Sequence, residues 1–223
     1  MTESRMSETY DRNCTNCPRL AELLAYVQER YPEYHARPVP SFGSTSPRLL
    51  IVGLAPGMHG ANATGRAFTG DYAGVLLYET LHAIGIASRP QSISVDDGLE
   101  LAGTRITNAV KCLPPQNKPV AAEVNACASK FLVHELAEVN RDGGVLLALG
   151  GISHKAIIRT LGLRQADYRF AHAAEHHLPD GRVLVDSYHC SRYNTSTRRL
   201  TPDMFMHAVE RAARLAQVGR FAS

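Results

Sequence analysis

The sequence has little net charge and no long hydrophobic run. Its 223 residues carry 24 Lys and Arg against 21 Asp and Glu, a net charge of +3, which is too small by itself to indicate a nucleic-acid partner. No apolar run approaches the roughly 20 residues of a membrane span, and residues 1–13 lack the apolar core of a secretory signal. We therefore expect no membrane association and a cytoplasmic protein, in a compartment where disulfides are rare.

The chain also lacks internal repeats and long linkers, so we expect residues 1–223 to form one domain. Apolar runs predict strands at 49–54, 104–110, 145–149 and 183–185. Helical spacing predicts helices at 18–31, 72–85, 119–140 and 152–161, and a last helix that begins near Thr201. Alternating strands and helices indicate an α/β fold with a parallel sheet covered on both faces.

In such folds ligands bind beyond the carboxyl ends of the strands. Three loops there are unusual: 53–71, 108–118 and 187–194. The first is rich in glycine around Phe68, and glycines let the backbone approach a ligand closely. It lacks the Gly-Lys-Ser/Thr of a Walker phosphate loop, and no helix opens soon enough for a dinucleotide loop. We interpret it as a ligand loop, although a tight strand-to-helix turn is the simpler alternative.

The third loop places His189 directly after a buried strand, beside Ser191, Arg192 and Asn194. A single histidine is as consistent with a structural role as with a catalytic one. The segment from Gly181 onward holds seven arginines against three acids. Such a cluster can contact phosphates, but it can equally form a solvated helix face.

Five cysteines form an uneven pattern: a C-x2-C pair at Cys14 and Cys17, then Cys112, Cys127 and Cys190. In a reducing compartment, clustered cysteines suggest a metal before disulfides. Spacing alone does not separate zinc from an iron–sulfur cluster. Cys127 is also compatible with a plain core position.

Four segments resemble the uracil-DNA glycosylase superfamily, and most closely its family five. They are GLAPG at 53–57, TGRAFTGDYAG at 64–74, ITNAVKCLPPQNKP at 106–119 and SYHCSRYNTSTRRLT at 187–201. The similarity runs from Cys14 to about residue 210. It implies a single α/β domain with a central four-stranded parallel sheet flanked by helices.

The resemblance also implies a structural [4Fe–4S] cluster held by Cys14, Cys17, Cys112 and Cys127, which would tie in the N-terminal arm, residues 1–17. Cys190 matches a variable position and is not expected to be a ligand.

The roles of the site residues follow from the same resemblance. His189 would donate a hydrogen bond to the base oxygen, and Asp71 is the carboxylate expected to assist catalysis. The residues expected to bind the base are Gly53, Leu54, Ala55, Pro56, Gly57, Phe68, which would stack on it, and Asn108, which would read its edge. The residues expected to contact DNA are Ser191, Arg192, Tyr193 and Asn194, with Arg192 and Tyr193 as a wedge.

The implied function is removal of uracil, and of other deaminated bases such as hypoxanthine, from double- or single-stranded DNA by a monofunctional enzyme. Leu54 and Ala55 stand where many relatives carry the residue that activates water, so the water-activating group is left open. We expect a monomer in the cytoplasm of a bacterium or archaeon, associated with the nucleoid. Two alternatives stay open: a non-enzymatic iron–sulfur or zinc protein that binds nucleic acid, and an enzyme acting on a free nucleotide or nucleoside.

Overall fold

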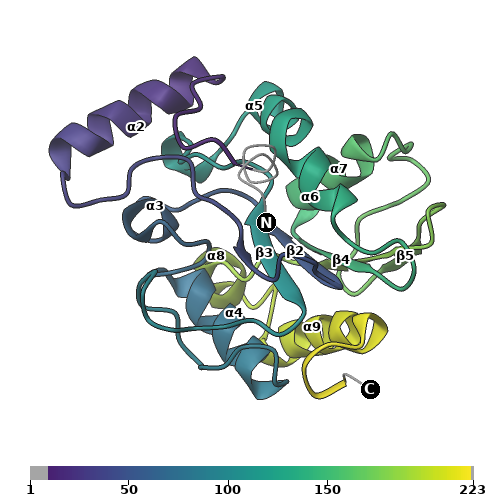
Figure 1. Cartoon of the computed structure of the whole chain (residues 1–223). Helices are drawn as coiled ribbons and strands as arrows, with labels where there is room; N and C mark the ends of the chain where they lie inside the picture. Colours follow the sequence, from purple (N-terminus) through teal and green to yellow (C-terminus); the bar gives the residue numbers. More distant parts are fainter. Residues whose placement is uncertain (1–9, 222–223) are drawn as a thin grey trace.

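The computed structural model describes residues 10–221, and Figure 1 shows a central sheet with helices on both faces. The strands are β1 (Phe42–Gly43), β2 (Leu49–Gly53), β3 (Thr104–Asn108), β4 (Val145–Leu149), β5 (Glu175–His177) and β6 (Val183–Ser187). Their order across the sheet is β1-β3-β2-β4-β6-β5. Residues 1–9, which include most of the arm expected to be tied in by a metal cluster, lie outside the described residues.

The four strands predicted from sequence form the parallel centre of this sheet. The expectation of a sheet with only four strands was wrong, because β1 and β5 add antiparallel pairs at the two edges. These edge strands have two and three residues and contain no apolar run, so a hydrophobic pattern does not reveal them. They form because β3 and β6 each offer backbone hydrogen-bonding groups along one side.

The helices that cover the sheet begin and end close to the predicted positions. They are α2 (Pro18–Arg30), α4 (Tyr72–Ala83), α5 (Ala121–Cys127), α6 (Val133–Ala137), α7 (Gly151–Thr160) and α9 (Pro202–Ala216). The helix predicted at 119–140 is α5 and α6 joined by a π-helical turn, Ala128–Leu132. Two short helices, α3 (Ala61–Thr64) and α8 (Arg192–Ser196), lie inside loops and were not predicted. No helix in the described part of the chain is long and apolar enough to cross a membrane.

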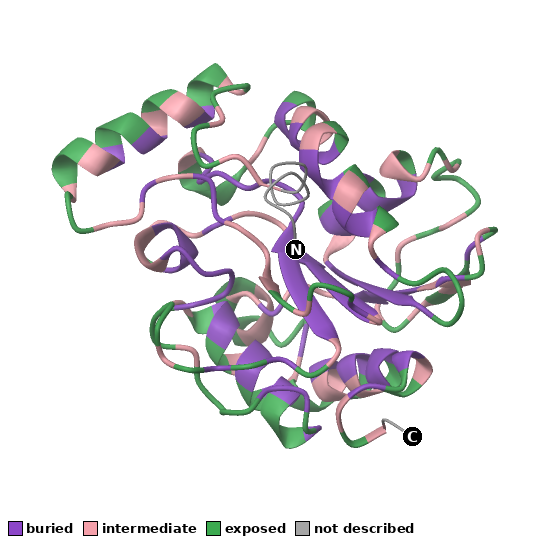
Figure 2. Ribbon diagram, in the orientation of Figure 1, coloured by how far each residue is buried: buried purple, intermediate pink, exposed green. Residues whose placement is uncertain are grey.

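The hydrophobic core has two halves, one on each face of the sheet. Along β2, Leu49 and Ile51 pack into the half that contains α4 and α9, whereas Leu50 and Val52 pack into the half that contains α2 and α5 to α7. Successive side chains of a strand point to opposite faces, so a continuous apolar run fills both halves. Figure 2 shows the buried strands between helices whose outer sides are exposed. This arrangement leaves the strand ends free for a site.

Candidate active site

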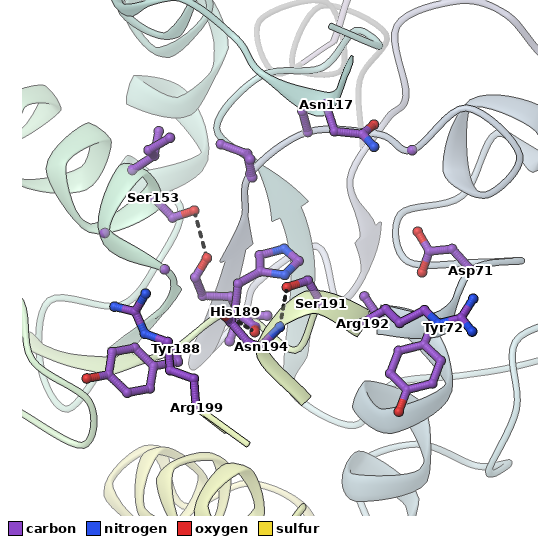
Figure 3. Close-up of a pocket in the computed structure, with 18 of the residues that line it drawn as sticks. Asp71, Tyr72, Asn117, Ser153, Tyr188, His189, Ser191, Arg192, Asn194 and Arg199 are labelled. Carbon is purple, nitrogen blue, oxygen red and sulfur yellow. Dashed lines mark hydrogen bonds between the residues drawn. The ribbon is translucent and has the colours of Figure 1, made fainter. Parts of the chain in front are cut away.

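A cavity of about 500 Å³ lies at the carboxyl ends of the central strands. The loop after β2 contributes Ala55 and Gly57, the turn after β4 contributes Gly150, and the loop after β6 contributes His189. Figure 3 shows Asp71 at one side of this pocket, Ser153 and Tyr188 at the other, and His189 between them. The pocket therefore lies where ligands bind in open α/β sheets.

His189 is held in the pocket by its own loop. Its carbonyl accepts a hydrogen bond of 2.8 Å from Asn194 Nδ2, while its ring atom Nδ1 is buried and has no hydrogen-bond partner among the described residues. Burial lowers the pKa of His189 to about 4, so the ring is neutral at neutral pH and donates a single N–H. A buried ring nitrogen without a partner is uncommon and suggests that a ligand or water supplies one.

Phe68 and Asn108 converge on Gly53 at the end of β2. A Cβ atom at Gly53 would lie 2.4 Å from Asn108 Oδ1 and 2.5 Å from Phe68 Cζ, so only glycine fits there. Phe68 adopts a positive φ of 56°, and its ring stacks on that of His189 with centroids 5.9 Å apart. The fold therefore brings together three of the side chains to which the sequence assigns contact with a base.

Asp71 has a structural role as the residue that caps a helix. It is the N-cap of α4, where its Oδ1 accepts a hydrogen bond of 2.8 Å from the backbone N–H of Gly74. Its other oxygen faces Gly57 and Gly60, whose missing side chains leave room for it. Burial raises the pKa of Asp71 above its ordinary value. The carboxylate thus caps a helix and lines the pocket at once.

The loop after His189 forms the outer rim. Ser191 is the N-cap of α8, and its hydroxyl accepts a hydrogen bond of 3.4 Å from the Asn194 N–H. Arg192 is exposed and lines the pocket. Tyr193 is 71% exposed and points away from the protein core. An exposed aromatic ring beside a pocket is available to contact a ligand larger than the pocket itself.

The C-terminal arginines divide into two groups. Arg182, Arg211, Arg214 and Arg220 form ion pairs with nearby carboxylates. Over residues 10–221, no ion pair involves Arg192, Arg198 or Arg199. Arg192 and Arg199 line the pocket, and the Arg199 guanidinium lies 4.5 Å from the centre of the Tyr188 ring. Two of these three arginines without an ion pair therefore line the pocket.

Four cysteines meet in a second place. Cys14, Cys17, Cys112 and Cys127 line one small cavity between α2, α5 and the end of β3, and all five cysteines of the chain are unbridged. Burial and the neighbouring thiols raise the pKa of Cys112, and burial raises the pKa of Cys127 to about 11. The Lys111 N–H donates to Cys127 Sγ at 3.3 Å, and Lys130 Nζ donates to Cys14 Sγ at 3.4 Å.

The fifth cysteine is separate, because Cys190 is buried in the other half of the core and donates to the Ala73 carbonyl at 3.4 Å.

Several predicted residues do not line the pocket itself: Gly53, Pro56, Phe68, Asn108 and Tyr193. The structure adds others that the sequence analysis did not assign: Tyr72, Asn117, Ser153, Phe170, Tyr188 and Arg199. Asn117 lies within a motif already recognised, and Gln116 and Asn117 both have positive φ, which is unusual for two successive residues other than glycine. Nothing local in the sequence marks Phe170, which reaches the pocket only through the fold.

The fold and this pocket define an α/β protein with a ligand site at the carboxyl edge of its sheet, and comparison with known proteins gives the family. The Uracil DNA glycosylase superfamily matches residues 40–213. The chain is 46% identical over 213 residues to a Type-5 uracil-DNA glycosylase of Thermus thermophilus, covering 91% of this chain and 94% of the relative. It is 40% identical to a Type-5 uracil-DNA glycosylase of Pyrobaculum aerophilum, covering 90% and 88% of the two chains. The chain therefore belongs to the uracil-DNA glycosylase superfamily, and its most similar relatives named here are of type five.

Proposed function

We propose that this chain is a monofunctional DNA glycosylase that extrudes uracil from DNA and hydrolyses its bond to the sugar. The observation that carries the proposal is His189, which lines the pocket as a neutral ring and whose buried Nδ1 has no hydrogen-bond partner among residues 10–221. A base departs most easily as a stabilised anion, and a preoriented donor in a dry pocket stabilises that charge as it forms. The family relationship supports the same chemistry.

Other residues in and beside the pocket fit this reaction. The rings of Phe68 and His189 are already in contact, so the base would lie beside His189, against Phe68 and within reach of Asn108. Asp71 would place a negative charge near the sugar as it becomes cationic, directly or through a water. Asn117 also lines the pocket and is a further candidate for holding that water. A base inside a duplex is out of reach of such a pocket, so the nucleotide must be flipped out.

The arginines without ion pairs indicate how DNA would be held. Arg192 and Arg199 would meet phosphates on either side of the flipped nucleotide, and the exposed Tyr193 would enter the space that it vacates. Ser191 and Asn194 would position this segment, since both make hydrogen bonds within it.

We also propose that Cys14, Cys17, Cys112 and Cys127 hold a structural [4Fe–4S] cluster. The four thiols line one cavity, and burial raises the pKa of Cys17, Cys112 and Cys127. A bound metal centre would deprotonate such thiols and use them as ligands. The alternative to a cluster is a zinc ion bound to the same four thiols. Zinc–sulfur bonds of about 2.3 Å would hold the sulfurs roughly 3.8 Å apart.

A cluster at these cysteines would supply rigidity between α2 and the loop that follows Asn108.

The range of bases is part of the proposal. Ala55 leaves an uncharged pocket wall, and a cavity of about 500 Å³ has room for a purine as well as uracil. We therefore expect hypoxanthine to be accepted. No lysine lines the pocket in the described structure, which supports hydrolysis by water without a covalent Schiff-base intermediate.

The test uses purified protein and oligonucleotides with a single uracil, hypoxanthine or xanthine, each offered as a duplex and as a single strand. Alkaline cleavage at the abasic site measures base release. Release of uracil with no adduct after borohydride reduction is expected. Tight DNA binding without release would instead support a non-enzymatic binding protein. Release only from free nucleosides would support an enzyme that acts on a free nucleotide or nucleoside. An adduct trapped by borohydride would contradict the monofunctional mechanism.

A further inference from the structure

Behind one wall of the pocket, a buried carboxylate joins three segments of the chain. Asp186 lies on β6 and is fully buried. Its Oδ1 is 2.8 Å from His154 Nδ1 on α7, and its Oδ2 is 3.0 Å from His176 Nε2 on β5. The His154 side chain is 1% exposed and that of His176 is 11% exposed. Asp186 and His154 are thus shielded from water, whereas His176 is slightly exposed.

The hydrogen-bond partners of His154 indicate which of its ring nitrogens carry a proton. Its Nε2 lies 2.8 Å from the Tyr168 carbonyl, which can only accept, so Nε2 carries a proton. Its Nδ1 faces a carboxylate oxygen, which also only accepts when ionised. With an ionised Asp186, both ring nitrogens would be donors, and the positive charge of the doubly protonated ring would offset the negative charge of the carboxylate. Opposite charges in direct contact are what makes burial of either one tolerable.

The same three residues organise the far wall of the pocket. The His154 ring meets the Phe170 ring edge-on with centroids 5.7 Å apart, and Phe170 lies against Gly151. The backbone of Asp186 pairs with residues 173 and 174, which follow Phe170 along the chain. Gly151 and Phe170 line the pocket, and Asp186 lies three residues before His189 on the same segment.

We propose that Asp186 is a positioning residue. By holding His154 doubly protonated and binding His176, it fixes the wall formed by α7 and Phe170 relative to the loop that carries His189. The proposal deepens the proposed function, since it takes this pocket to be the place of base excision. A buried ion pair contributes little net stability compared with apolar packing, but it specifies one arrangement because any other leaves a charge unpaired. Displacing a reacting group by about 1 Å from its productive position can slow a reaction about 10²-fold.

The proton state is tested without DNA, so it is independent of the proposed function. In protein labelled with ¹⁵N-histidine, NMR at neutral pH should show a directly bonded, slowly exchanging proton on both ring nitrogens of His154. Asp186→Asn should remove the proton from Nδ1. A single protonated nitrogen in the wild type would overturn the proposal. So would a stoichiometric divalent metal bound by His154, His176 and Asp186, since it would replace the shared protons.

The positioning role is tested by single-turnover excision of uracil, well below the melting temperature of each variant. Asp186→Asn should lower the rate on the order of 10²-fold while the DNA dissociation constant stays unchanged. The matched control is Glu138→Gln, which removes the charge of Glu138 from its partly buried pair with Arg105 near the opposite ends of the strands. This control should lose stability and keep its rate.

If Asp186→Asn also keeps its rate, the residue only stabilises the fold and the proposal fails. Should Asp186→Asn not fold, His176→Gln at the partly exposed partner is measured against the same control, and an unchanged rate overturns the proposal. A wild-type enzyme that releases no uracil would contradict the proposed function and leave the NMR result standing.

Discussion

The rings of Phe68 and His189 lie nearly parallel, 25° apart, with their centroids separated by 5.9 Å. The first belongs to the glycine-rich loop after β2 and the second to the loop after β6. Because the two strands are parallel, their carboxyl ends bring both loops to one edge of the sheet. The stacking surface and the donor for a base are therefore aligned before DNA binds, and preorganisation of this kind is what makes a donor effective in catalysis.

His189→Ala should lower the single-turnover rate of uracil excision on the order of 10²-fold or more, the scale of losing one preoriented donor. DNA affinity should change much less, since the side chain contributes no charge at neutral pH. The control is His177→Ala, which removes an exposed histidine of β5. A variant that excises uracil at nearly the wild-type rate would show that His189 is not the donor.

The pH dependence follows from the lowered pKa of His189, about 4 in the folded protein against 6.5 in a free side chain. The excision rate should show no inflection near pH 6.5. Between these two values the unfolded chain binds a proton that the folded chain does not. The contribution of His189 to the free energy of unfolding is therefore fully present above about pH 6.5 and is lost as the pH falls toward 4.

Denaturant unfolding of the wild type and of His189→Gln, at about pH 7 and about pH 4.5, checks the stability claim. The wild type should lose more stability than the variant. Equal losses would mean that the His189 pKa is not lowered.

Asp71 has two roles that different substitutions separate. Asp71→Ala removes both the charge and the N-cap of α4, so it should cost about 1 kcal/mol of stability and slow excision. Asp71→Ser restores an N-cap acceptor without the charge. If the carboxylate acts in catalysis, the serine variant should keep the wild-type melting temperature and remain slow. Full activity in Asp71→Ser would leave the cap as the only role of the residue.

The unpaired arginines should account for part of the salt dependence of DNA binding. Arg192→Ala and Arg199→Ala should each reduce the slope of log K against log salt concentration by about 0.9, the value for one phosphate contact. Arg211→Ala is the control, since Arg211 is paired with Glu175 at 2.7 Å. Equal slopes for all three variants would place the phosphate contacts elsewhere.

The cysteine proposal predicts brown protein that contains about four irons per chain. Cys112→Ser should lose iron, melt at a lower temperature and bind DNA less tightly, because the loop after Asn108 would lose its anchor. Cys190→Ser should retain the iron, since Cys190 lies in the other half of the core. Colourless protein with one bound zinc ion would refute the cluster and leave the glycosylase proposal intact.

The sequence by itself determined the parallel centre of the sheet and most of the helices. Runs such as 49–53 and 145–149 are buried on both faces, and only the central strands of a covered sheet require that pattern. The start of α9 could also be predicted from neighbouring residues, because the Thr201 hydroxyl caps the helix by accepting a hydrogen bond of 3.2 Å from the N–H of Met204. The family resemblance of the motifs also indicated His189, Asp71 and the four clustered cysteines as candidate site residues.

Only the tertiary structure decided what surrounds those residues. The edge strands β1 and β5 exist because neighbouring strands offer free hydrogen-bonding groups, which no local pattern reports. Which arginines remain unpaired depends on carboxylates distant in sequence, such as Glu175 beside Arg211. The link of His154 to Asp186, and the approach of Phe170 to the pocket, likewise join segments far apart in the chain. Local sequence sets backbone preferences and burial, whereas the partners of a polar side chain are set by packing across the whole domain.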